Sequence, residues 1–112
     1  MKKFAILALS ALAFTTADAQ EITGASSLSL SDVTVGTGQT GIRSVIGTAT
    51  NRTNGQLHFA VVKINLYDGQ GNLLGNTIAQ ASNVESGAHW RFEAPIMYAS
   101  TAAYKVVEVD AF

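Results

Sequence analysis

The chain has 112 residues, of which 47% are hydrophobic and 13% are charged, and its formal net charge at pH 7 is −1. A nearly neutral chain with scattered charges lacks the basic surface that attracts nucleic acid or an anionic membrane, so we expect neither as a partner. The sequence has no cysteine, which excludes disulfides, and stability must come from packing and strand pairing. The length suits a single domain with one core.

Residues 1–19 have the layout of a secretory signal peptide. A start with two lysines precedes an apolar stretch over residues 4–14, and Ala17-Asp18-Ala19 forms a small-x-small cleavage site before Gln20. The apolar stretch is shorter than the about 20 residues that cross a bilayer, so we expect no membrane insertion. We predict a cleaved signal peptide over residues 1–19 and one exported domain over residues 20–112, periplasmic or secreted from a bacterium. A buried N-terminal helix is the alternative.

The rest of the chain predicts short β-strands and no helix. It is rich in Val, Ile, Thr, Ser, Ala and Gly, and its apolar residues recur with a period of two. In chain order we expect strands over residues 26–35, 42–51, 57–67, 73–82, 88–94 and 103–112, with connections over residues 36–41, 52–55, 69–72, 83–87 and 97–101. The alternation slips near Asp32, which predicts a β-bulge. This pattern is typical of an antiparallel sandwich of six or seven strands.

Two of these strands have clearly different faces. The even-numbered residues Ala60, Val62, Ile64 and Leu66 form an uninterrupted apolar row, so we predict that they face the core. In the strand over residues 88–94, Trp90 and Phe92 share one face and three polar side chains share the other. Pro95 is expected to end that strand or to place it at a sheet edge, because proline cannot donate to a strand ladder.

The order of several motifs resembles the FxLYD domain, a bacterial family. The motifs are Gly47-Thr48-Ala49-Thr50-Asn51, Ile64-Asn65-Leu66-Tyr67-Asp68, Gly71-Asn72-Leu73-Leu74-Gly75, Val84-Glu85-Ser86-Gly87, and Trp90 with Phe92. The resemblance spans residues 45–112 and departs at Ile64, where the family has Phe, and at Ser86, where it has Pro. It implies an immunoglobulin-like sandwich in an exported protein and implies no chemistry, since fold alone assigns no function.

The residues that could bind metal are few. Zinc needs about three or four converging ligands, and the sequence offers two separated histidines, His58 and His89, which are interpreted as surface positions on strands. Met97 with His89 is too small a set of soft ligands for copper(I). We therefore expect no metal and no cofactor.

The sequence also lacks a catalytic pattern. Serines are present, but there is no Gly-x-Ser-x-Gly elbow or comparable arrangement of nucleophile and base. Glu108 and Asp110 lie two residues apart on one strand face, a spacing that a glycosidase pair allows. We interpret them as solvated acids that protect an edge strand. We expect no enzyme and assign no catalytic residue.

Four further residues are interpreted as parts of the fold. Asp68 can accept backbone N–H groups in the turn that follows it, Tyr67 can close the sandwich corner with its ring, and Asn51 can act at its own strand end as Asp68 does. The sequon Asn51-Arg52-Thr53 is taken as coincidental. Trp90 is assigned to the core instead of to a ligand platform.

The expected function is a non-enzymatic binding or structural module of the cell envelope, with an envelope protein or a second copy as partner. It would act through exposed strand edges or through the loops over residues 36–41, 52–56 and 69–72. The first alternative is a self-assembling subunit that exchanges residues 21–35 as a strand, against which stands the pairing of that segment within its own sheet. The second is a small hydrolase or metal-binding protein.

Overall fold

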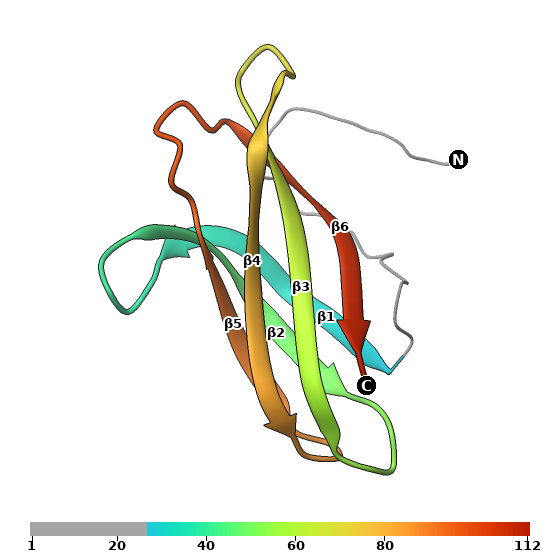
Figure 1. The fold of residues 1–112 in the computed structure, drawn as a ribbon. Helices are drawn as coiled ribbons and strands as arrows, with labels where there is room; N and C mark the ends of the chain where they lie inside the picture. The colour runs from blue at the N-terminus through green and yellow to red at the C-terminus, as the bar shows by residue number, and fades with distance from the viewer. Residues whose placement is uncertain (1–26) are drawn as a thin grey trace.

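The computed structural model describes residues 27–112 and consists of six antiparallel strands in two sheets (Figure 1). The strands are β1 (Leu28–Thr37), β2 (Arg43–Asn51), β3 (Leu57–Tyr67), β4 (Leu73–Val84), β5 (His89–Pro95) and β6 (Ala103–Ala111). One sheet has the order β1-β2-β5 and the other the order β4-β3-β6. This connectivity matches strands A, B, E and C′, C, F of an immunoglobulin-like sandwich. The predicted all-β sandwich is confirmed with six strands, while the predicted signal peptide lies outside the described residues.

Two strands extend two residues past their predicted C-terminal ends. β1 continues to Thr37, where a loop was expected from Gly36 onward, because Gly36 and Thr37 still pair with Ser44 and Arg43 of β2. β4 continues to Val84, where a turn was expected from Asn83 onward. In both places pairing with a neighbouring strand overrides a local composition that is typical of turns.

The predicted bulge at Asp32 is confirmed. The register of β1 against β2 shifts between Ser31 and Thr34, and Asp32 has a φ of 55°. Aspartate is one of the few residues other than glycine that adopt this left-handed conformation readily. A second shift lies in β6, where Val107 is the extra residue between the partners of Lys63 and Ile64.

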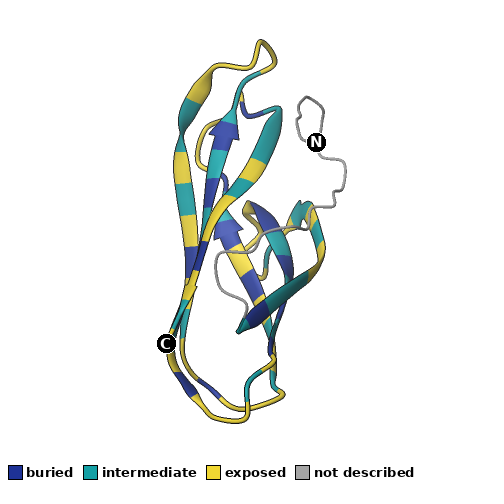
Figure 2. Ribbon diagram, turned by 90° about the vertical axis from the view of Figure 1, so that its right-hand side faces the viewer, coloured by how far each residue is buried: buried dark blue, intermediate teal, exposed yellow. Residues whose placement is uncertain are grey.

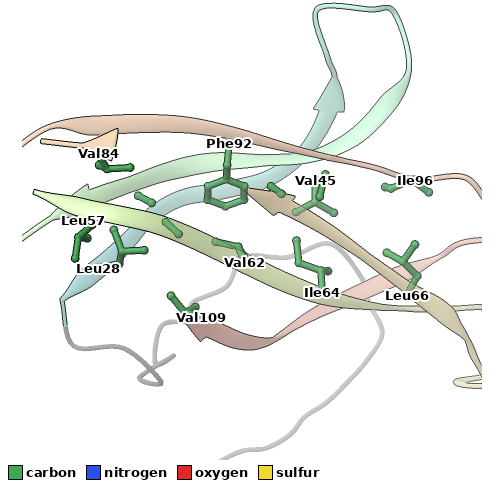
Figure 3. Packing of buried hydrophobic residues seen from close by; sticks show 14 residues of the cluster. Leu28, Val45, Leu57, Val62, Ile64, Leu66, Val84, Phe92, Ile96 and Val109 are labelled. Atoms are coloured by element: carbon green, nitrogen blue, oxygen red, sulfur yellow. The ribbon is translucent and has the colours of Figure 1, made fainter. Parts of the chain in front are cut away.

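The core lies between the two sheets, and β3 supplies its central row. The side chains of Ala60, Val62, Ile64 and Leu66 are 0% exposed, so the predicted inward face of this strand is confirmed. Figure 3 shows Val62, Ile64 and Leu66 across the core from Phe92 and Val45 of the other sheet. Alternating bands of buried and exposed residues along the strands are visible in Figure 2.

Gly47 makes room for the largest side chain of the core. A Cβ atom at Gly47 would lie 2.7 Å from Cζ of Phe92 and 3.1 Å from Cγ2 of Val33. The absence of a side chain therefore lets the Phe92 ring sit directly against β2, opposite its pairing partner Gly47. Within residues 27–112 there is no helix of a length and hydropathy that could cross a membrane.

Candidate functional site

The Asp68 carboxylate organises the turn between β3 and β4. Its Oδ1 atom accepts hydrogen bonds from the backbone N–H groups of Gln70 and Asn72, both at 2.9 Å, and its Oδ2 atom accepts one from Nδ2 of Asn72 at 3.1 Å. The backbone N–H of Asp68 donates to the carbonyl of Asn72 at 3.0 Å. The predicted structural role of this carboxylate is thus matched by its contacts. The backbone carbonyl of Tyr67 accepts a hydrogen bond from Ala102, which joins this end of β3 to the β5–β6 connection.

These hydrogen bonds favour the ionised form of Asp68. The backbone N–H of Asn72 is the main cause that lowers the pKa of the Asp68 carboxyl, followed by the Asn72 side chain and the N–H of Gln70. Because the pKa is lower in the folded chain than in the unfolded one, ionisation of Asp68 stabilises the fold. That contribution is complete above the ordinary carboxyl pKa of about 3.9 and is lost as the pH falls through the folded pKa.

Replacing Asp68 with alanine is expected to lower the thermal midpoint by a few degrees at pH 7, because three hydrogen bonds to the turn disappear. Asp68→Asn keeps an acceptor oxygen and is expected to lower the midpoint less. Thermal unfolding measured from pH 7 to pH 2 should show that the difference in thermal midpoint between wild type and Asp68→Ala shrinks only in the acidic range. A midpoint difference of the same size at pH 2 would mean that the charge of Asp68 plays no part in the turn.

The Asn51 side chain joins the two sheets at the opposite end of the sandwich. Its Nδ2 atom donates to the carbonyl of Val84 in β4 and to the carbonyl of Gly55, both at 2.9 Å. Its Oδ1 atom accepts from the backbone N–H of Thr53 at 2.8 Å and from the Thr53 hydroxyl at 2.7 Å. Asn51 is 1% exposed, and both of its amide hydrogens are used, so the folded chain presents no acceptor for a glycan at this sequon.

The three loops singled out in the sequence are tight and internally bonded. The β1–β2 loop is closed by hydrogen bonds from Gly38 to Ile42 and from Gly41 to Gly38, and the backbone N–H of Gln39 donates to the Glu93 carboxylate at 3.2 Å. The other two loops are held by Asn51 and Asp68 as described above. These hydrogen bonds use part of the polar groups of the loops to fix the loop shapes.

The residues considered for chemistry are dispersed. His58 and His89 lie exposed at the starts of β3 and β5, and the Nδ1 atom of His89 is 2.9 Å from the Thr50 hydroxyl. Glu108 and Asp110 are exposed on β6, which is an edge strand as expected. Within residues 27–112, no three His, Asp or Glu side chains gather closely enough to hold a metal ion.

Trp90 lies partly in the core and partly in a surface depression. Its ring packs against Phe92, with the ring centroids 5.8 Å apart, and it is half-buried. The predicted core position is therefore only partly correct, because Trp90 lies near the start of β5 and keeps part of its surface exposed. A depression of about 310 Å³ lies there between β4 and β5, and residues 81–85 and 88–91 line it.

Within residues 27–112, three of the four sheet edges are protected against pairing with a further strand. β1 has the bulge at Asp32, β5 has alternating polar side chains and ends at Pro95, and β6 combines three charged residues with the bulge at Val107. Charges, proline and bulges are the devices by which natural proteins discourage edge-to-edge pairing. Each of these three edges is therefore a poor template for another strand.

β4 is the least protected edge. It is a 12-residue edge strand without a charged residue or a proline. Its register against β3 shifts at Leu74, near its start, and has no shift from Gly75 to Val84, where Asn83 has a left-handed φ of 58°. Ile78, near its middle, is 44% exposed. In Figure 1 β3 lies on one side of β4 and pairs with it, and β5, which belongs to the other sheet, is drawn on the other side. The lack of charge over this segment is visible in the sequence, but the position of the strand at an edge is not, because it depends on pairing between distant strands.

The β4 edge with the neighbouring depression at Trp90 is thus the candidate functional site of the described residues. It offers backbone hydrogen-bonding groups along one strand and a partly exposed aromatic ring beside the end of that strand. No family model, curated protein or solved structure matches the chain.

Proposed function

We propose that the processed chain is an exported, non-enzymatic binding module of the bacterial envelope, of the FxLYD type, and that it acts through the edge of β4. The observation that carries the proposal is the long, uncharged edge strand described above, whose pairing with β3 is in constant register from Gly75 to Val84. A free edge presents a row of N–H and C=O groups that an extended segment of another protein can pair with. The leader-like residues 1–19 support export to the envelope.

The depression at Trp90 supports the same mode of binding. In strand addition, backbone hydrogen bonds provide affinity and pockets for alternate side chains provide specificity. The depression adjoins the C-terminal part of β4 and includes Ala81, Val84 and Trp90 among its lining residues. A strand added to β4 could place an apolar side chain there, against the exposed part of Trp90.

Ile78→Glu is expected to abolish most of the binding by placing a charge in the middle of the β4 edge. Val107→Glu is the matched control: both residues are β-branched, lie on opposite edges of the same sheet and are similarly exposed, at 44% and 41%. Immobilised processed protein would be incubated with envelope extract, and the bound proteins quantified by mass spectrometry. Partners should be retained by wild type and Val107→Glu and lost by Ile78→Glu. Equal retention by both variants would contradict the proposal.

The proposed export predicts where the N-terminus lies after the signal peptide is cleaved. We expect cleavage after Ala19, so that the protein recovered from the envelope begins at Gln20. Intact-mass measurement of protein expressed with its complete sequence in a bacterium checks this directly. Recovery of a chain that retains Met1 would rule out the export prediction, although the fold of residues 27–112 would be unaffected.

A further inference from the structure

We infer that a second copy of this chain fits the β4 edge: two β4 strands pair antiparallel about a two-fold axis and join two three-stranded sheets into one sheet of six. The inference rests on the proposed function, since it names a partner for the same edge. A two-fold contact uses the same surface on both copies, so the surface must be complementary to itself.

Charge is the first requirement. Near a two-fold axis each side chain meets itself or a close neighbour from the other copy, so a charged residue there meets a charge of its own sign. β4 has no charged residue along its 12 positions. On β6, by contrast, Glu108 and Asp110 would bring acidic groups together in a pair of copies. Two paired β4 strands therefore bring no like charges together along the strand.

The second requirement is that the exposed apolar side chain of Ile78 lies near the two-fold axis, where the other copy covers it. Pairing with β3 places Asn76, Ile78, Gln80 and Ser82 on the outer face of the sheet, opposite the outward-facing residues of β3. Directly opposed residues of antiparallel strands share a face, so a two-fold axis at the middle of β4 must pass beside Ile78 or Ala79. In the first case the two Ile78 side chains are opposed, and in the second they are diagonal neighbours. Either arrangement covers the exposed apolar side chain at the centre of the strand.

The size of the contact determines its strength. Two paired strands of about ten residues meet along a line of about 34 Å that is only one sheet thick. Such a contact buries less than the about 800 Å² per partner that is typical of a stable complex. The dimer is therefore weak and reversible, and it leaves the edge available to another extended segment at low concentration. Pairing with a second copy and pairing with another protein exclude each other.

Single cysteines report the geometry directly, because the chain contains none of its own. Ile78→Cys places a thiol beside the axis, where a short bismaleimide can join two copies. Ser82→Cys is the matched control on the same face of the same strand, and its copies would lie about 20 Å or more apart across the axis. We expect a covalent dimer of the processed Ile78→Cys protein and almost none of Ser82→Cys. Equal cross-linking of the two would overturn the inference.

Sedimentation equilibrium of the wild type provides the second readout. We expect reversible dimer formation that grows with protein concentration, persists in Val107→Glu and is lost in Ile78→Glu, with circular dichroism showing that both variants are folded. A wild type that remains monomeric at the highest soluble concentration would overturn the dimer. If the wild type is monomeric, the capture experiment decides what remains. Loss of the envelope partners by Ile78→Glu would mean that the binding edge stands and only the second copy fails. Retention of the partners by Ile78→Glu would mean that the proposed function fails as well.

Discussion

Leu66→Ala is expected to lower the free energy of unfolding by about 2–5 kcal/mol, the range for a large aliphatic side chain removed from a packed core. Leu66 is 0% exposed and lies in β3, the central strand of its sheet, paired with Gly75 on one side and Tyr104 on the other. Neither neighbouring strand can close the space without breaking its register against β3. The cavity should therefore persist, and the loss should lie well above that of a surface substitution. Urea unfolding at constant pH measures it.

Lys63→Ala is the matched control, since Lys63 lies on the opposite face of the same strand. It is expected to change the unfolding free energy little. The comparison tests the register of β3, because a slip of one residue would exchange the two faces. A loss below about 1 kcal/mol for Leu66→Ala, outside the range for core truncation, would show that the even-numbered residues of β3 do not form the core.

The sequence was most informative where a structural property is local. The even-numbered row from Ala60 to Leu66 predicted the inward face of β3, because side chains alternate along any strand whatever its neighbours are. The bulge was visible as a slip of the same alternation at Asp32. The turn at Asp68 was visible because a carboxylate can hold nearby backbone N–H groups without any tertiary contact.

The properties that depend on distant pairing were not accessible in the same way. β5 follows β4 in the chain but pairs with β2 in the other sheet, and this crossover is what leaves β4 at an edge. Pro95 in β5 and the acids of β6 indicated two of the edges, but no local pattern placed β4 at another. The sequence therefore predicted a strand over residues 73–82 but did not identify it as the candidate binding surface. The same applies to Trp90, whose alternation places it inward while its position near the end of the sandwich leaves it half-buried.

Asn51→Ala is expected to destabilise the fold more than Asp68→Ala does. Removal of the amide leaves the carbonyl of Val84 without this buried partner and leaves Thr53 without its acceptor. A buried group that loses its hydrogen bond costs about 1–3 kcal/mol, and more than one group is affected, so a total loss of about 2–4 kcal/mol is expected. Thr53→Ala should cost less, because the Asn51 amide still joins β2 to Val84. Chemical denaturation of the two variants provides the comparison.

Asn51→Asp tests the contribution of the hydrogen bonds while the shape of the side chain is kept. The two residues are nearly the same size, but a carboxylate would present an oxygen to the carbonyls of Gly55 and Val84, where Asn51 presents a donor. An ionised group at a site that is 1% exposed also loses its hydration. We expect the Asp variant to be at least as unstable as the Ala variant at pH 7 and to recover relative to it as the pH falls, since a protonated carboxyl regains one donor. Equal stability of Asn51→Asp and wild type at pH 7 would show that these bonds do not hold the two sheets together.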